Sequence, residues 1–121
     1  MVTLRFPDDS RSVDLSAALA RVGGDEELLR EIAQIFLDES PNSLARLRAA
    51  AGAGDADAIE TAAHTLKGSV GNFGAETARA AAFRVEEIGR SRDLSGVQKA
   101  LAALETAVHA LNAELARLIA S

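Results

Sequence analysis

The 121-residue chain has no cysteine, tryptophan or tyrosine, and only two prolines and four phenylalanines. The absence of cysteine excludes disulfides, thiolate chemistry and cysteine-ligated metals, and it is compatible with a reducing compartment. No segment is apolar for long enough to span a bilayer, and the first residues lack a signal-peptide pattern. We therefore expect a cytoplasmic protein that does not enter a membrane.

Basic clusters and nucleotide-binding motifs are missing as well. The net charge is −5 at pH 7, so nucleic acid is not an expected partner. The sequence has neither a Walker loop nor a kinase-type glycine-rich loop, and it lacks an acidic cluster suited to Mg²⁺ and a nucleotide. We expect a protein that is not an enzyme, with no kinase or ATP site and no cofactor of its own.

Hydrophobic residues make up 48% of the chain, and aromatic residues only 3%. Abundant alanine and leucine with few strand formers favour helices throughout. Helix N-caps are expected at Asp14, Asp25 and Asp55, and a capping box is expected from Ser95 to Gln98. A final seam alternates spacings of four and three residues, at Val97, Leu101, Leu104, Val108, Leu111, Leu115 and Leu118.

These patterns predict an all-α fold, an antiparallel up-down four-helix bundle with a short N-terminal helix capping one end. Residues 13–121 would form this domain, and residues 1–12 an extended lead-in. Pro41 interrupts an apolar helical pattern that continues on both sides of it. We expect one long kinked helix there, ending near Gly52 or Gly54; two helices split at Ser40 are the alternative.

The segment of residues 59–74 has two different faces when it is read as a helix. One is an apolar stripe of Ile59, Ala62, Ala63, Leu66, Val70 and Phe73. His64 points roughly 160° away from Leu66, and Lys67, Gly68 and Gly71 follow it on the outer face. Gly74 is placed to end the helix in the left-handed region.

The two glycines of the outer face are expensive for a helix, at about 1 kcal/mol each relative to alanine. They would remove side chains from the surface beside the imidazole, so that the backbone of a partner can approach. We therefore predict that Gly68 and Gly71 form a docking surface, and we assign the same role to Thr65 and Glu60.

An exposed imidazole has an unprotonated nitrogen at cellular pH and can attack phosphorus. Lys67, one turn along, would supply positive charge for the phosphoryl oxygens. His109 lies off the leucine seam and is expected to be an ordinary surface residue. The pairs Glu60/His64 and Glu105/His109 face outward, whereas di-iron bundles use inward-facing Glu-x-x-His ligands, so we expect no metal site.

The run His-Thr-Leu-Lys-Gly-Ser at residues 64–69, followed by Asn-Phe-Gly-Ala at residues 72–75, resembles the phosphorylation motif of histidine-containing phosphotransfer (HPt) domains. Residues 36–41, with Leu44 and Leu47, resemble the preceding helix of that family, and the resemblance spans roughly residues 12–120. It implies that His64 accepts a phosphoryl group from a receiver-domain aspartate and passes it to another receiver, in a bacterial multistep two-component phosphorelay. The implied partners are response-regulator receivers, which bring the Mg²⁺, and a sensor histidine kinase, possibly a hybrid one. We expect a monomer.

The helix after Gly74 should return antiparallel, which places Glu86 or Glu87 beside the imidazole. The resemblance favours Glu86, which matches a family residue that hydrogen-bonds the second ring nitrogen and fixes the tautomer. Arg90 would add a second positive charge near the phosphate. A carboxylate at this position would also repel that phosphate. The alternative for Glu86 and Arg90 is a solvated helix face with an i,i+4 ion pair.

Two other functions remain open from the sequence. The chain could be the phospho-accepting domain of a chemotaxis-type or hybrid histidine kinase, and would then take phosphate directly from a kinase domain. It could also be a helical adaptor that is never phosphorylated, in which Gly68 and Gly71 only shape a docking groove. Phosphorylation of His64 separates the adaptor from the other two.

Overall fold

The computed structural model describes residues 13–121, and the expected lead-in of residues 1–12 lies outside them. The described residues form five helices and no strand, so the prediction of an all-α fold is confirmed for this part of the chain. The helices are α1 (Leu15–Arg21), α2 (Glu26–Ala53), α3 (Ala56–Gly71), α4 (Glu76–Ser91) and α5 (Val97–Ala120). None of them combines the length and hydropathy needed to cross a membrane.

Three aspartates begin helices as predicted. The side chains of Asp14, Asp25 and Asp55 each accept a hydrogen bond of 3.0–3.1 Å from the backbone N–H three residues on. The predicted capping box at Ser95 is wrong, because α5 has Gly96 at its N-cap and no side-chain cap. The Ser95 N–H instead donates to the Asp93 carboxylate at 3.2 Å, which draws Ser95 into the preceding turn.

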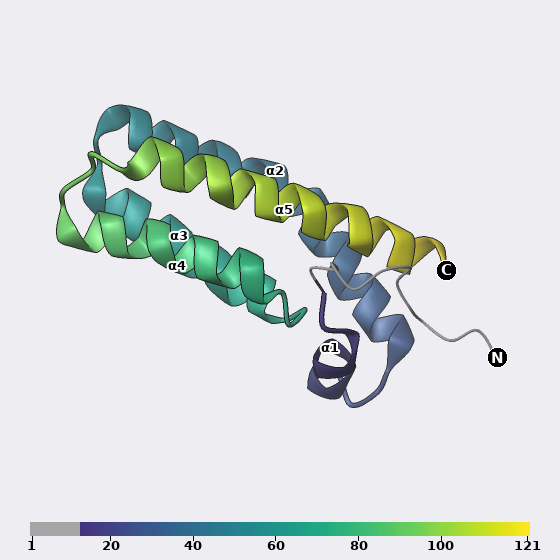
Figure 1. The fold of residues 1–121 in the computed structure, drawn as a ribbon. Coiled ribbons are helices and arrows are strands. Elements are labelled where there is room, and N and C mark those ends of the chain that lie inside the picture. The colour runs from purple at the N-terminus through teal and green to yellow at the C-terminus, as the bar shows by residue number, and fades with distance from the viewer. Residues whose placement is uncertain (1–12) are drawn as a thin grey trace.

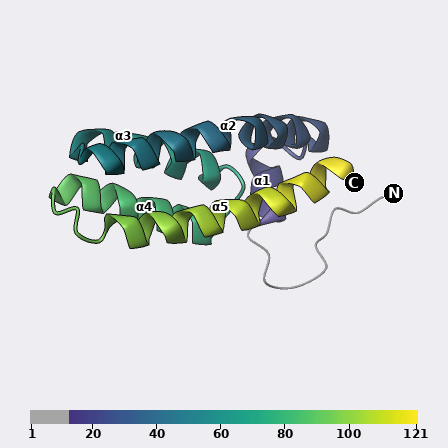
Figure 2. The ribbon, with the colours of Figure 1, turned by 90° about the horizontal axis from the view of Figure 1, so that it is seen from above.

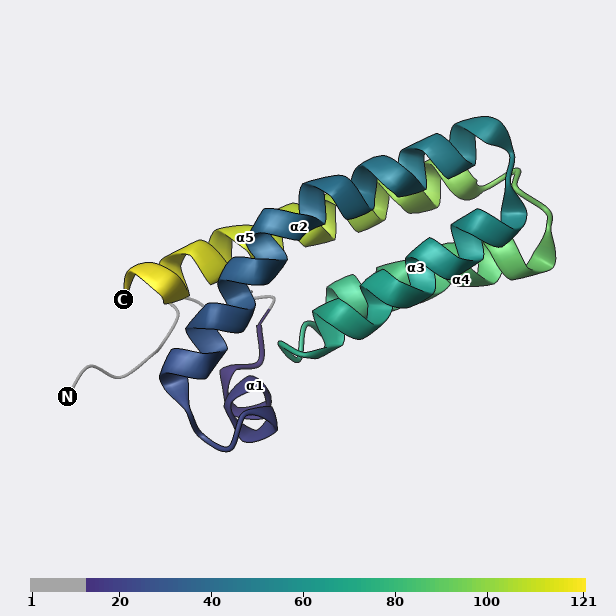
Figure 3. The ribbon, with the colours of Figure 1, turned by 180° about the vertical axis from the view of Figure 1, so that it is seen from behind.

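Helix α2 runs through Pro41 as one helix of 28 residues, and Figure 3 shows it bending along its length. The alternative of two helices split at Ser40 is therefore wrong. Ser40 is fully buried at this point, and its hydroxyl accepts a 2.9 Å hydrogen bond from the Asn112 amide of α5. The hydrogen bond between Ser40 and Asn112 thus lies next to Pro41, which lacks the N–H that would continue the backbone hydrogen bonds of α2.

The four long helices share one apolar core. Helix α2 lies beside α5 and α3, and α4 lies beside α3 and α5 (Figures 1 and 2), while α1 packs against α2. All seven residues of the seam on α5 are buried, as the spacing predicted. From α3, Leu66 and Val70 enter the same core, and Phe73 beyond its end meets Phe36 edge to face with ring centroids 5.6 Å apart.

The turn after α3 is tied to the start of α1. Helix α3 ends at Gly71, and Gly74 adopts the predicted left-handed conformation with φ +61°. The Asp14 N–H donates to the Phe73 carbonyl at 3.0 Å. A Cβ at Gly74 would lie 2.6 Å from Asp14 Cβ, so a residue without a side chain is needed at this crossing.

Helices α3 and α4 lie in close contact at Gly89. A Cβ there would lie 2.8 Å from the backbone nitrogen of Glu60 and 2.9 Å from the carbonyl oxygen of Ala56. Backbone atoms cannot move aside as a flexible side chain can, so glycine allows this approach. Gly89 therefore sets how near the side chains of α4 come to those of α3, one turn from Glu86.

Candidate functional site

His64 lies on the outer face of α3, opposite the buried Leu66, and its side chain is 66% exposed. Gly68, on the same face, is exposed, and Gly71 beyond it is half-buried. A Cβ at either glycine would meet no atom within 4 Å. Packing therefore does not explain these glycines, and the surface beside the imidazole is open.

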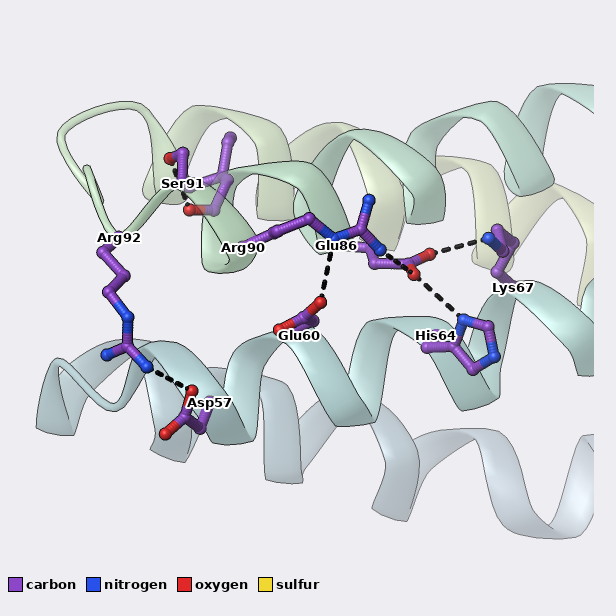
Figure 4. Close-up of polar contacts among 9 residues, drawn as sticks. Asp57, Glu60, His64, Lys67, Glu86, Arg90, Ser91 and Arg92 are labelled. Atoms are coloured by element: carbon purple, nitrogen blue, oxygen red, sulfur yellow. Dashed lines mark hydrogen bonds and ion pairs between the residues drawn. The ribbon is translucent and has the colours of Figure 1, made fainter.

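A buried carboxylate lies directly beside the imidazole. Glu86 comes from α4, and its side chain is only 3% exposed. Its Oε2 lies 2.9 Å from His64 Nδ1 and its Oε1 lies 2.8 Å from Lys67 Nζ (Figure 4). The structure thus selects Glu86 over Glu87 as the residue beside the ring. Glu86 does not lie on a solvated helix face, although the i,i+4 ion pair of that alternative does form, with Arg90.

Arg90 joins this carboxylate to a second one. Its Nη2 donates to Glu86 Oε2 at 2.9 Å, and its Nε donates to Glu60 Oε2 of α3, also at 2.9 Å. We refer to Glu60, His64, Lys67, Glu86 and Arg90 as the Glu86 cluster. Figure 4 shows the Arg90 guanidinium in contact with the carboxylates of both Glu86 and Glu60.

The charge of Glu86 decides which ring nitrogen carries the hydrogen. Burial alone would raise the pKa of Glu86, but the hydrogen bonds from Lys67 and His64, together with the positive charge of Lys67, outweigh it and hold the pKa below the ordinary value of 4.5. An ionised carboxylate only accepts hydrogen bonds. Nδ1 of His64 must therefore be the N–H, and in the neutral form of the ring the lone pair belongs to Nε2, on the side of the ring away from Glu86 (Figure 4).

Lys67 is held from two sides. Its ammonium pairs with Glu86 and also lies 4.9 Å from the centroid of the Phe83 ring. Phe83 is 37% exposed on α4, and a cation over an aromatic face is attracted to it. Phe83 lies outside the buried positions of α4, such as Ala78, Ala82 and Val85, and this misfit is the signal in the sequence for a place at the edge of the site.

The remaining candidates lie apart from the Glu86 cluster or make only local contacts. Thr65 is exposed, and its hydroxyl donates to the Thr61 carbonyl one turn back at 3.1 Å. His109 is exposed on α5. Across residues 13–121, no three or more His, Cys, Asp or Glu side chains are grouped so that they could hold a metal ion.

Comparison with known proteins identifies the family. The model of the Hpt domain family matches residues 31–118, and the chain belongs to that family. Hpt domains are phosphocarrier modules that interact with receiver domains and kinases. This protein is accordingly a histidine phosphotransfer protein of a phosphorelay.

A solved structure shows the same fold. The crystal structure of histidine-containing phosphotransfer protein B (HptB) from Pseudomonas aeruginosa PAO1 matches with a TM-score of 0.83 and 23% sequence identity. The match covers 90% of this chain and 95% of that one. A search among curated proteins finds no match.

The ionised state of Glu86 gives a testable pH dependence. Glu86→Gln should lower the free energy of unfolding at pH 7 by about 1–3 kcal/mol, because charged hydrogen bonds to a buried group are lost. The pKa of Glu86 is depressed in the folded state, so the wild-type advantage is present above the ordinary value of 4.5. It should disappear as the pH falls through the lower, folded-state value.

Urea unfolding at pH 7 and between pH 5 and 3 measures this difference. Glu87→Gln is the matched control, since Glu87 is the exposed neighbour on the same helix, and it should change little at any pH. A wild-type advantage over Glu86→Gln that stays constant down to pH 3 would rule out the ionised carboxylate.

Proposed function

We propose that His64 is the phosphorylated residue, and that Nε2 accepts the phosphoryl group from the aspartate of one receiver domain and passes it to another. The observation that carries this proposal is the 2.9 Å contact between Nδ1 and the buried Glu86 carboxylate. It leaves the nucleophilic nitrogen unprotonated on an exposed ring. The phosphorylation motif around His64 supports the same assignment.

The transfer step needs no further reactant. The lone pair of Nε2 forms the N–P bond, the P–O bond to the aspartate breaks, and the aspartate leaves with the electron pair as a carboxylate. The ring keeps its proton on Nδ1 and becomes positively charged. That charge faces Glu86, whose carboxylate stabilises it at hydrogen-bond distance. We propose that Lys67 then turns toward the phosphoryl oxygens as a point charge.

The partners supply the rest of the chemistry in this proposal. The Mg²⁺ belongs to the receiver domain, and this chain uses no cofactor and has no kinase or ATP site of its own. The phosphoryl group enters the relay from a sensor histidine kinase, possibly a hybrid one. We place the protein in the bacterial cytoplasm as a monomer.

We propose that the receiver docks on the surface around His64 formed by Glu60, Thr65, Gly68 and Gly71. The open space at the two glycines supports this, because a Cβ there would meet no atom of this protein within 4 Å. It would stand between the imidazole and an approaching partner.

The domain that presents this surface would be residues 13–121. We propose that α2 to α5 form an antiparallel up-down four-helix bundle and that α1 caps one end of it. The support is the ring of contacts from α2 to α3, α3 to α4, α4 to α5 and α5 to α2.

His64→Gln should abolish phosphate uptake, because it removes the nucleophile while keeping a polar side chain of similar reach. Stability should change by no more than about 0.5 kcal/mol, since the position is exposed. The measurement is transfer of radiolabel from a phosphorylated receiver domain, with circular dichroism to check folding. His109→Gln is the control and should label normally. Normal labelling of His64→Gln would refute the assignment.

Gly68→Gln should impair transfer without harming the fold. Glutamine is a better helix former than glycine, so the free energy of unfolding should rise by up to about 1 kcal/mol. Receiver binding and transfer should fall at least about tenfold, a loss of about 1.4 kcal/mol. The control is Gly52→Gln, at another exposed helical glycine with open space around its Cβ, but on α2. Equal transfer by the two variants would show that Gly68 is not needed for access.

A further inference from the structure

The charges of the Glu86 cluster cancel in pairs around the imidazole. Glu60 and Glu86 carry two negative charges, and Lys67 and Arg90 carry two positive ones, all joined by contacts of 2.8–2.9 Å. These groups come from α3 itself and from α4. Among residues 13–121, none of the ion pairs joins this cluster to α2, the other helix packed on α3.

The balance matters because Glu86 acts on His64 in two ways. Its hydrogen bond to Nδ1 leaves Nε2 free, which a nucleophile requires. A carboxylate without a counter-ion beside an imidazole would also favour the doubly protonated ring, which has no lone pair for attack. A cation paired with Glu86 offsets the negative charge of the carboxylate and leaves its hydrogen bond to Nδ1 in place.

Two cations reach Glu86, but they are not equivalent. Lys67 binds Oε1 and is the group proposed to turn toward the phosphoryl oxygens, so its contact with Glu86 would be lost during transfer. Arg90 binds Oε2, the same oxygen that faces His64 Nδ1. Its planar guanidinium also donates Nε to Glu60, and a lysine ammonium could not serve both carboxylates in this fixed geometry.

We propose that Arg90 is a positioning residue that holds Glu86 and balances its charge, and so keeps the imidazole of His64 neutral and reactive. Glu60 holds the Arg90 guanidinium in place through its hydrogen bond. The negative charge of Glu60 has the opposite effect on the His64 ring from the positive charge of Arg90. Arg90 also leaves Glu86 with a counter-ion when Lys67 moves to the phosphate. The reactivity attributed to the neutral ring rests on the proposed function, whereas the charge balance itself does not.

The test is an NMR titration of the His64 ring in the unphosphorylated protein. Arg90→Gln removes a positive charge and should move the titration midpoint upward by roughly 0.3–0.5 pH unit, the order expected for one nearby, partly screened charge. Glu60→Gln removes a negative charge and should move it downward. Arg90→Lys keeps the charge and should restore most of the wild-type midpoint.

The opposite signs make the test specific, because both Gln variants break the same Arg90–Glu60 ion pair. A purely structural role of that pair would move both midpoints in the same direction, and this outcome would overturn the proposal. Arg92→Gln is the matched control. Arg92 pairs with Asp57 of α3 at 2.7 Å, and Glu86 pairs instead with Arg90. The His64 midpoint in Arg92→Gln should therefore equal that of the wild type. An equal shift in Arg92→Gln would also refute a specific role for Arg90.

This titration is independent of the proposed function, since it uses no phosphate donor and no receiver. If His64→Gln still took up label while Arg90→Gln shifted the midpoint as expected, the charge balance would stand and the assignment of the nucleophile would fall. If the midpoints did not move while His64→Gln failed to label, the assignment of the nucleophile would stand and the charge balance would fall.

Discussion

The hydrogen bond between His64 Nδ1 and the buried Glu86 carboxylate is the contact on which the rest of the site depends. It determines which ring nitrogen is free, and it exists only because α4 lies close against α3. Gly89 permits that approach, since any side chain there would meet the backbone of α3 at 2.8–2.9 Å. The apolar faces of both helices hold the pair together through residues such as Leu66 and Val85.

A carboxylate buried to this degree requires compensation, because burial disfavours its charge. Lys67 and Arg90 provide it from the two sides of Glu86, and both remain partly exposed at their charged ends. The site therefore combines a fixed, desolvated anion with two partly exposed cations. In the proposed transfer step, Lys67 turns to the incoming phosphoryl group while Arg90 stays on Glu86.

Most of the fold and half of the site could be predicted from the sequence, for identifiable reasons. Local signals were reliable: the aspartate caps and the seam on α5 depend on residues a few positions apart. His64, Lys67 and Gly68 share one helix face, so helical geometry alone relates them. The capping box at Ser95 failed because Asp93 competes for the Ser95 N–H. The close approach at Gly89 joins residues some thirty positions apart, and no local pattern in α4 reveals what faces it.

The most direct test of the account is a ¹⁵N NMR measurement of the two ring nitrogens of His64, before and after phosphorylation. The account predicts that Nδ1 carries the hydrogen in the free protein and that phosphorus is bonded to Nε2 in the phosphorylated one. Hydrogen on Nε2 of the free protein, or phosphorus on Nδ1, would contradict it. Either result would mean that the Glu86 contact does not determine which nitrogen reacts.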